Sequence, residues 1–409
     1  MSAPIAVVGG GPVGLVVALA FAAEGVPVVV LEADADGVRA EWRGSTLHPP
    51  TLELLDRIDL ASVAVSGGVR VDRLQYRDLE LGRVAEFDYG VLDGKTAYPF
   101  RIQYEQYKLL RQLRAAAADS PNIELRYGQR VVTVDQDDDR VAITVRRDDG
   151  AADRLVTSWL IGADGARSTV RRATGIEFPG DTYPTQSLVA ATPFDLAAAV
   201  DDLGPVSYWT GPGGRLSLIR TPDTWRVALS TDVAADRGPA ALPEESVPHP
   251  RLVAALDRLV GDRRWASVPL GQHQLYRSHQ RVATRFRAGR ALLVGDAAHL
   301  TSTTGGMGLN SGVHDAFDLA GRLAGCLRLS DDSGAQQAAD QYAAARHEVA
   351  TRIVQPTTRA VRAGVDATDA TAREARLDQL CRTAEDPMLA ERHLREVSML
   401  AAPDTVGTS

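Results

Sequence analysis

The sequence contains few cysteines and few lysines, and the scarcity of cysteine narrows the classes of protein it can belong to. Only Cys326 and Cys381 occur among 409 residues, without a CxxC pair or a histidine-rich neighbour. Two such residues cannot form a disulfide framework and do not match the ligand spacing of a metal site. We therefore expect no bound metal and a reducing, cytoplasmic location. Lys95 and Lys108 are the only lysines, a bias toward arginine that is typical of a GC-rich bacterial gene.

Long apolar runs and blocks of like charge are also missing. The longest apolar stretch, Val13–Ala23, is followed by Glu24 and is much shorter than the roughly 20 residues that cross a bilayer. The first residues lack the basic start and small-residue cleavage site of a signal peptide. The net charge of −8 is spread along the chain, which argues against a nucleic-acid or membrane-binding face. We expect small-molecule partners, with no nucleic acid and no membrane.

The opening of the chain predicts a βαβ unit. A strand at Ile5–Val8 is followed by a glycine turn, a helix at Pro12–Ala23 and a second strand at Val28–Leu31. Short, wholly apolar strands of this kind are typical of parallel sheets that are buried on both faces. With 44% hydrophobic and 24% charged residues, the chain is long enough for two or three domains.

The rest of the chain predicts a change of architecture and a return to the first one. The pattern predicts helices at Tyr104–Ala118 and from about Ser311 to Leu327, and strands at 123–127, 131–135, 141–146, 159–162 and 291–294. Between about residues 179 and 272, short strand patterns alternate with Gly, Pro and Asp turns, as in an antiparallel sheet. The segment Asp331–Gly334 precedes a helical tail. We expect an α/β protein with a Rossmann-like domain, an inserted mostly antiparallel β domain and a helical C-terminal segment.

The turn of the βαβ unit reads Gly9-Gly10-Gly11-Pro12-Val13-Gly14, which matches GxGxxG between a strand and a helix. Gly9 permits the tight turn, Gly11 lets the backbone approach a pyrophosphate, and Gly14 allows close packing of helix on strand. The helix N-terminus offers N–H groups and a positive dipole to the phosphates. Glu32, after the second strand, can accept hydrogen bonds from ribose hydroxyls. An ordinary glycine turn is the alternative, but the full pattern favours dinucleotide binding.

Two later segments place an aspartate at the end of a predicted strand. One contains Asp164 and Arg167 in Gly162–Arg171, and the other contains Gly295-Asp296 in Gly289–His299. Ligands of doubly wound sheets bind at the carboxyl ends of strands, where an aspartate can bind the polyol of a long cofactor. GxGxxG alone does not distinguish FAD from NAD, so these two segments favour FAD.

With three motifs in this order, most of the sequence resembles the aromatic-hydroxylase family of class A flavoprotein monooxygenases, typified by para-hydroxybenzoate hydroxylase. The resemblance implies that the ADP half of FAD is bound by Gly9, Gly11, Gly14 and Glu32. It implies that Asp164 and Arg167 contribute to the binding of both FAD and the nicotinamide cofactor. The ribityl chain of FAD would be bound by Gly295 and Asp296. We expect a discontinuous FAD-binding domain (1–72, 98–178 and 273–330), a substrate domain (73–97 and 179–272) and a C-terminal segment (331–409).

Two further positions are similar to the family. Arg43, in Arg43-Gly44-Ser45-Thr46-Leu47-His48-Pro49, resembles an arginine that contacts the cofactor near its pyrophosphate. Gln106 resembles the family's FAD-contacting glutamine. The alternatives are a solvated loop charge and a helix surface residue, and cofactor contact is favoured for both.

A glycine-rich loop, Thr304-Gly305-Gly306-Met307-Gly308-Leu309-Asn310, follows Asp296 and leads into a predicted helix. Its backbone N–H groups can approach a flat ring, and a helix N-terminus directed at the flavin N1 and C2 carbonyl stabilises the anion of reduced flavin. Gly305, Gly306 and Gly308 are therefore the candidate catalytic residues, and residues 306–310 are candidate FAD contacts. The alternative is a linker with an ordinary Asn or Ser helix cap.

The sequence departs from the family just before this loop. Ser302 and Thr303 occupy the positions where the family usually has a pair of prolines. Prolines stiffen a loop, whereas hydroxyl groups can donate hydrogen bonds, so this change bears on flavin mobility and on the class of substrate.

The resemblance implies that NAD(P)H reduces FAD, that reduced flavin captures O2, and that a C4a-hydroperoxide transfers one oxygen atom to a phenol or polycyclic aromatic. The alternatives are a flavin-dependent epoxidase or reductase with a non-aromatic substrate, and a flavin-binding regulatory protein without turnover. The sequence leaves open the substrate, the choice of NADH or NADPH, and the oligomeric state, for which a homodimer is one option.

Several histidine and aromatic residues are further candidates for the catalytic or substrate site. His299 lies inside the second aspartate motif, where support of the loop is a better interpretation than catalysis as a base. In the middle region, side chains with rings either line a substrate pocket or belong to the core, and strand aromatics favour the core. These are Tyr208, Trp209, Trp225, His273 and Tyr276.

Overall fold

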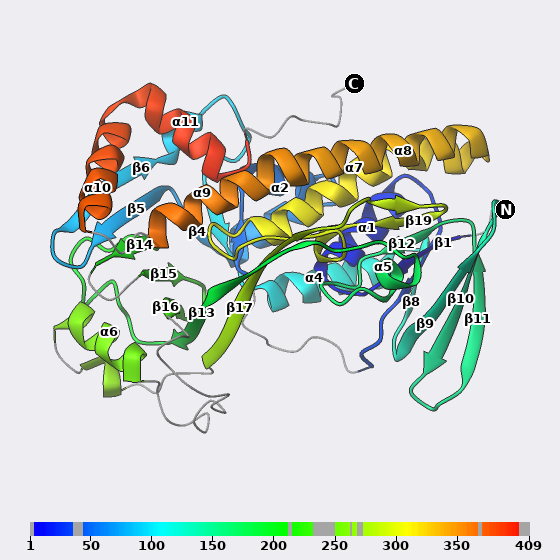
Figure 1. The fold of residues 1–409 in the computed structure, drawn as a ribbon, viewed down its shortest axis with the longest axis horizontal. Helices are drawn as coiled ribbons and strands as arrows, with labels where there is room; N and C mark the ends of the chain where they lie inside the picture. Colours follow the sequence, from blue (N-terminus) through cyan, green and yellow to red (C-terminus); the bar gives the residue numbers. More distant parts are fainter. Residues whose placement is uncertain are drawn as a thin grey trace.

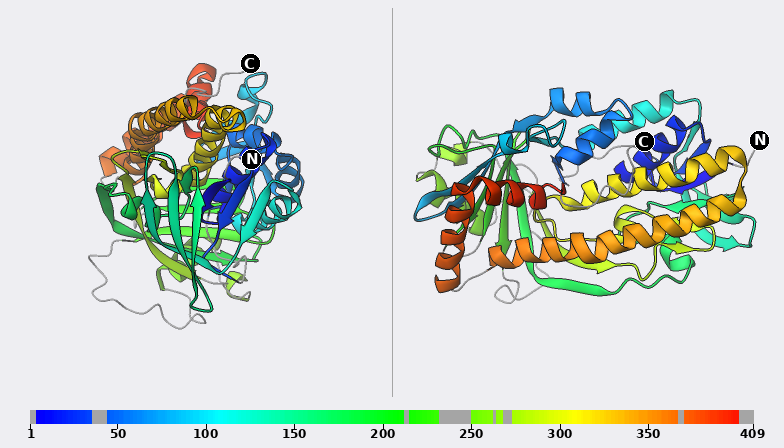
Figure 2. Two further views of the ribbon diagram at one scale, coloured as in Figure 1. Left: turned by 90° about the vertical axis from the view of Figure 1, so that its right-hand side faces the viewer. Right: turned by 90° about the horizontal axis from the view of Figure 1, so that it is seen from above.

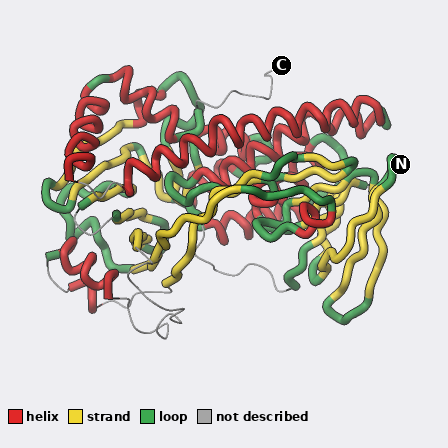
Figure 3. The backbone as a smooth tube through the Cα atoms, viewed as in Figure 1, coloured by secondary structure: helices red, strands yellow, loops and turns green. Residues whose placement is uncertain are grey.

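The computed structural model describes residues 4–35, 44–211, 215–231, 250–261, 264–267, 273–366 and 370–400. The molecule is elongated, with a parallel sheet at one end, a larger sheet at the other and long helices that run between them (Figure 1). Figure 3 shows the longest helices along the upper side of the strands, with shorter helices below them. The expected α/β class, with a Rossmann-like part, an antiparallel part and C-terminal helices, is confirmed.

The first sheet has six strands and contains the predicted βαβ unit. Its order is β18 (Arg287–Ala288), β19 (Ala291–Leu293), β12 (Leu160–Gly162), β1 (Ile5–Val8), β2 (Val28–Leu31) and β8 (Ile123–Arg126). Neighbouring strands are parallel, except that β18 is antiparallel to β19. The carboxyl ends of β1, β12 and β19 therefore lie side by side at one edge, where the three sequence motifs begin.

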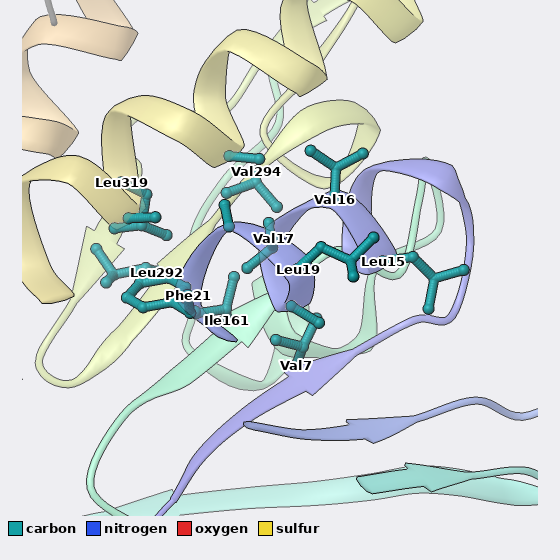
Figure 4. Close-up of a cluster of buried hydrophobic side chains, with 14 of the residues drawn as sticks. Val7, Leu15, Val16, Val17, Leu19, Phe21, Ile161, Leu292, Val294 and Leu319 are labelled. Atoms are coloured by element: carbon teal, nitrogen blue, oxygen red, sulfur yellow. The ribbon is translucent and has the colours of Figure 1, made fainter. Parts of the chain in front are cut away.

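Helices cover this sheet because its strands are apolar on both faces. Helix α1 (Pro12–Ala23) packs against α4 (Gln106–Asp119) and α7 (Met307–Leu329). Figure 4 shows the side chains of α1, β1, β12, β19 and α7 in a single hydrophobic cluster. Phe21 and Ile161, for example, are both completely buried.

A separate three-stranded antiparallel sheet projects from this end of the molecule (Figure 1). It consists of β9 (Gln129–Gln136), β10 (Val141–Arg147) and β11 (Ala152–Thr157). The sequence predicted the first two strands but not β11, whose alternating pattern is mostly polar and exposed.

The second large sheet has eight strands and is mostly antiparallel. Its order is β20 (His299–Leu300), β17 (His273–Val282), β13 (Gly180–Thr192), β16 (Trp225–Thr231), β15 (Leu216–Arg220), β14 (Val206–Thr210), β5 (Arg73–Asp78) and β6 (Gly82–Asp88). One face packs on α6 (Pro250–Val260), and the other packs on α10 (Ala370–Glu385) and α11 (Pro387–Val397). Strand β17, which the sequence-based division placed with the FAD-binding domain, pairs with β13 in this sheet.

Shorter elements complete the fold. A small sheet of β3 (Thr46–Leu47), β7 (Arg101–Gln103) and β4 (Val69–Val71) adjoins α2 (Pro49–Asp56) and α3 (Ala61–Gly67). Helix α5 (Thr169–Ala173) follows β12, and the 3-10 turns are Tyr89–Leu92, Arg264–Ser267 and Gly295–Ala297. Among the described residues, no helix is long and apolar enough to cross a membrane.

The C-terminal helices tie the two ends together. Helix α8 (Asp332–Val349), a π-helical turn (Ala350–Val354) and α9 (Gln355–Asp366) run on without interruption along the molecule (Figure 2). At one end Tyr342 donates a hydrogen bond to the carbonyl of Leu293 in β19, 2.7 Å away. At the other end Gln280 of β17 donates to the carbonyl of Gln355 at 2.8 Å. This long helix therefore contacts both large sheets.

Candidate functional site

The glycine turn between β1 and α1 is shaped for close backbone approach. Gly9 has a φ of +107°, and a Cβ atom there would lie 2.5 Å from the carbonyl oxygen of Ala163. A Cβ at Gly14 would lie 1.9 Å from the carbonyl oxygen of Gly9. By contrast, a Cβ at Gly11 would meet no atom within 4 Å. The first two glycines are thus needed for packing, whereas Gly11 faces open space at the helix N-terminus, where a pyrophosphate fits.

Glu32 lies directly beside this turn. Its carboxylate accepts hydrogen bonds from the backbone N–H groups of Gly10, at 2.6 Å, and of Asp34, at 2.8 Å. The side chain is half-buried, and its two oxygens retain lone pairs beyond these two bonds. The structure therefore places Glu32 beside the turn, and its carboxylate holds the turn in place.

The two other aspartate motifs follow the neighbouring strands but differ in what their side chains do. The Asp164 carboxylate caps α5, because it accepts bonds from the Ser168 hydroxyl and the N–H groups of Thr169, at 2.6 Å, and Val170, at 3.2 Å. Arg167 is exposed. Asp296 is likewise exposed at the end of β19. Asp164 is thus engaged in a helix cap, and Asp296 lies in the turn that follows β19.

A buried charged cluster supports Gly295 and the strand end. Asp315 of α7 is completely buried and accepts hydrogen bonds from the Gly295 N–H at 2.9 Å, His299 Nε2 at 2.8 Å and Arg346 Nε at 2.7 Å. Burial opposes the charge on Asp315, but His299, Arg346 and the hydrogen bonds lower the pKa of its carboxyl below the ordinary value. The bond to Asp315 fixes the His299 side chain in the protein interior next to Gly295.

Sequence reasoning missed Asp315 and Arg346, although a signal was present. Asp315 stands among the buried residues of α7, most of which are apolar, with Ser311 and Asp318 as buried polar neighbours. An ionisable residue at such a position is rarely buried without a partner. The identity of that partner, 31 residues further along, is a matter of tertiary packing.

The glycine-rich loop differs from the prediction in where it ends. Helix α7 begins at Met307 rather than near Ser311, so residues 307–310 form its first turn. Gly305 and Gly306 have φ values of +85° and +70°, the left-handed conformation that glycine adopts without strain. This conformation, rather than a long flexible linker, turns the chain, and it brings the helix N-terminus to the loop. The unpaired N–H groups of the first turn therefore lie at the loop.

The loop is fixed to β3 and the residue after it. The Asn310 side chain donates to the carbonyl of Thr46 at 2.9 Å and accepts from the N–H of His48 at 3.0 Å. His48 Nε2 lies 2.9 Å from the carbonyl oxygen of Gly305 and donates to it. Burial and the charge of Arg101 hold the pKa of His48 well below its ordinary value, so the imidazole is neutral. A Cβ on Gly306 would lie 2.8 Å from the Cβ of Thr46, so the loop packs tightly here.

Hydroxyl groups stand where the family usually has prolines. Ser302 is completely buried and donates to the Thr304 hydroxyl at 3.1 Å, and Arg215 donates to the same oxygen at 2.8 Å. The Gly306 N–H is also engaged, since it donates to the Thr303 carbonyl at 3.3 Å. Hydrogen bonds within the loop, together with one from Arg215 just before β15, therefore hold it in place of ring stiffness.

Other predicted residues fall into three groups. Gln106 starts α4, and its Oε1 would lie 3.9 Å from a Cβ on Gly44, so it is next to the segment that follows Arg43. Arg43 itself, and the side chains of His273 and Tyr276, lie outside the described residues. Trp209 and Trp225 are core residues of the cluster that faces α6. Tyr208 points to the opposite face, where its ring lies 5.8 Å from that of Tyr76.

The first turns of α7 bring the sequence motifs together. A Cβ on Gly312 would lie 2.5 Å from Val13 and 3.2 Å from the Cα of Gly295. The first turns of α7 therefore contact both the GxGxxG turn and the Gly295-Asp296 segment.

A scan against protein-family models matches residues 2–357 to the FAD binding domain family. The chain belongs to this family. Its aromatic-hydroxylase character, expected from the motifs, is confirmed by relatives that are named as aromatic monooxygenases. The match covers both large sheets and most of the long C-terminal helix.

Three relatives of this FAD-binding chain illustrate the similarity. Para-nitrophenol 4-monooxygenase of Pseudomonas sp. (strain WBC-3) is 34% identical over 358 residues, which cover 86% of this chain and 85% of the relative. The crystal structure of p-nitrophenol 4-monooxygenase PnpA from Pseudomonas putida DLL-E4 superimposes with a TM-score of 0.86 at 29% identity, covering 97% and 98% of the two chains. Aklavinone-11 hydroxylase, solved with FAD and aklavinone, gives 0.76 at 28% identity and covers 91% and 70%.

Proposed function

We propose that this FAD-dependent monooxygenase uses NAD(P)H and O2 to hydroxylate an aromatic small molecule. The observation that carries the proposal is the alignment of three motifs on adjacent strand ends, continued by the glycine loop at the α7 N-terminus. When bound, FAD supplies the acceptance of hydride and the activation of oxygen. The names of the relatives support O2 as the second substrate.

We assign the ADP half of FAD to the first motif. Gly11 leaves room for the pyrophosphate, while Gly9 and Gly14 hold α1 against β1 so that its N–H groups point at the phosphates. Pro12 and Val13 form the first helical turn, and Glu32 accepts from the ribose with its remaining lone pairs. Arg43 is assigned to a contact near the pyrophosphate, and Gln106 is assigned to a contact with FAD.

We assign the ribityl chain to Gly295 and Asp296 and the flavin ring to residues 305–310. The first-turn N–H groups of α7, including that of Gly308, together with the positive end of the helix, stabilise negative charge on reduced flavin. Met307, Leu309 and Asn310 hold that turn, the last through its bonds to β3. Asp164 keeps α5 in place, and the exposed Arg167 is available to the nicotinamide cofactor.

The test is a screen of NAD(P)H consumption with a panel of phenols and polycyclic aromatics, with mass spectrometry of the products. We expect a purified yellow protein that releases FAD on acid precipitation, and at least one aromatic that gains a single oxygen atom. Recovery of FMN would overturn the cofactor, and reduction without oxygen gain would favour a reductase. Light scattering of the same preparation measures the oligomeric state, for which we propose a homodimer. The scarcity of cysteine and the need for NAD(P)H support a cytoplasmic location.

An Asp296→Ala variant should retain FAD less well. Loss of a charge-assisted hydrogen bond to the ribityl chain is expected to raise the Kd for FAD roughly ten-fold or more. The Kd is measured by titrating apoprotein with FAD and following flavin fluorescence. Asp378→Ala, at an exposed position of α10, serves as the control and should change nothing. An unchanged Kd in Asp296→Ala would remove Asp296 from the cofactor site.

A Gly306→Val variant should bind FAD but react poorly. Valine at a φ of +70° is strained, and its Cβ collides with Thr46, so the start of α7 must move. We expect flavin reduction to slow roughly ten-fold or more, as a change of about 1.4 kcal/mol in the barrier would produce, and hydrogen peroxide to rise at the expense of product. Gly82→Val is the control, because its φ is +78° and its Cβ meets no atom within 4 Å. Normal reduction and coupling in Gly306→Val would make the loop a simple connector.

A further inference from the structure

Arg101 is a buried cation for which the described part of the chain provides no carboxylate partner. Its exposed fraction is 1%, and its Nη1 atom forms no hydrogen bond. Its Nε donates to the hydroxyl of Tyr89, which is itself completely buried. A guanidinium cannot escape burial by losing its proton, so an unpaired one is costly unless a ligand completes it.

The groups around Arg101 are phenols and imidazoles rather than carboxylates. Burial opposes its charge, and the phenol groups of Tyr89, Tyr208 and Tyr76 raise the pKa of Arg101, so it remains a cation. Tyr76 bonds to His393 of α11 at 3.0 Å. Burial and the charge of Arg101 lower the pKa of His393 to about 4, so this ring is neutral. None of these groups can neutralise the guanidinium at neutral pH.

The backbone places Arg101 next to the contacts of the glycine-rich loop at Gly305. Strand β7 pairs with β3 through Ile102 and Leu47, so Arg101 is adjacent to His48, whose imidazole bonds to the Gly305 carbonyl. A second unpaired donor lies two residues along the same strand. Gln103 is completely buried and uses its Oε1 to accept from Ser45 and Thr46, which leaves its Nε2 without a partner.

We propose that Arg101 binds a negatively charged oxygen on the aromatic substrate, so that the enzyme selects aromatics that carry a phenolate or a carboxylate. The inference rests on the proposed function, because it places the substrate beside the loop assigned to the flavin ring. The Nη1 donor forms a charge-assisted hydrogen bond to that oxygen, and the rings of Tyr76 and Tyr208, 5.8 Å apart, belong to the group of phenols around Arg101. Arg101 is then a specificity-determining residue that sequence patterns did not single out.

The test compares anionic ligands with neutral ligands of the same shape. Oxidised holoenzyme is titrated, in mildly alkaline buffer, with 4-nitrophenol, which is then largely ionised, and with its neutral ether 4-nitroanisole. Benzoate and benzamide form the second pair and separate a carboxylate from a phenolate. Binding is followed by the change in flavin absorbance and by calorimetry, so no turnover is required.

We expect Arg101→Met to weaken binding of the favoured anion roughly 10- to 100-fold and to leave its neutral counterpart within about three-fold. Arg101→Lys, which keeps the charge, should recover part of the loss. Arg111→Met, at an exposed position of α4, is the matched control and should match wild type. FAD content is measured for every variant to confirm that the cofactor site is intact.

Equal loss for anion and neutral ligand, or no loss for either, would overturn the proposal and leave Arg101 as a structural residue. If Arg101→Met fails to fold, the Lys variant and the wild-type comparison decide, since an enzyme that does not prefer either anion contradicts the inference. Because these are binding measurements, they stand even if the aromatic screen yields no oxygenated product, and a failed titration leaves the monooxygenase assignment untouched.

Discussion

A Gly14→Ala protein is expected to be purified with little or no FAD and with a less stable first βαβ unit. The added methyl group would lie 1.9 Å from the Gly9 carbonyl oxygen, so α1 must move away from β1. Overpacking of this kind costs about 1–3 kcal/mol, occasionally more, out of a total stability of about 5–15 kcal/mol. The same movement withdraws the helix N-terminus from the phosphates. The measurements are the ratio of FAD to protein and the thermal midpoint of the apoprotein.

Substitutions at two other glycines distinguish an effect on helix packing from an effect on cofactor contact. Gly11→Ala adds a methyl group that meets no protein atom within 4 Å, so the apoprotein should keep its midpoint while FAD binding weakens. Gly325→Ala, in α7, also meets nothing within 4 Å and should alter neither property. Wild-type FAD content and midpoint in Gly14→Ala would show that the turn tolerates a wider helix–strand spacing.

Replacing Asp315 with asparagine should cost about 3–5 kcal/mol of unfolding free energy, because the buried Arg346 then loses its counter-charge. The backbone N–H of Gly295 also loses a charged acceptor, so FAD retention should fall with stability. Chemical denaturation, followed by tryptophan fluorescence, gives the first quantity, and flavin content gives the second.

The effect of Asp315 should depend on pH in one direction. The folded state lowers the pKa of this carboxyl below its ordinary value, so the folded state binds its proton less readily than the unfolded state. The stabilisation is therefore complete above about pH 4 and is lost progressively as the solution becomes more acidic. The difference between wild type and Asp315→Asn should shrink at acid pH.

Asp318→Asn is the matched comparison, because it lies on the same helix and pairs with Arg322, which is 24% exposed and can be rehydrated. Its loss of stability should be clearly smaller. Equal losses in the two variants would show that the network around Asp315 adds no stability beyond that of the Asp318–Arg322 pair on the same helix.

The local parts of this structure were predictable from sequence because they depend on neighbouring residues. Strand, glycine turn and helix at Ile5–Ala23 follow from apolar runs and from the conformational demands of Gly9 and Gly14, and the structure has them at the predicted residues. The start of α7 was misplaced because glycines at 305, 306 and 308 resemble a linker. The distinction lies in backbone angles, since 305 and 306 are left-handed whereas 308 is helical.

The parts that could not be predicted depend on contacts between distant segments. Arg101 is followed by an apolar residue and an unremarkable glutamine, and its burial is a product of β7 pairing with β3 and β4. His48 reaches the Gly305 carbonyl across more than half of the chain. No spacing rule within one segment encodes such a meeting.

The long C-terminal helix sets the rotational alignment of the two large sheets. From Asp332 to Asp366 it is about 50 Å long at a rise of about 1.5 Å per residue. Each residue turns a helix by about 100°. The angle around the helix axis between Tyr342 and Gln355, which contact the two sheets, is therefore set by the number of residues between them. The wide turn at Ala350–Val354 lies within this interval and takes up an extra residue that a regular helix could not.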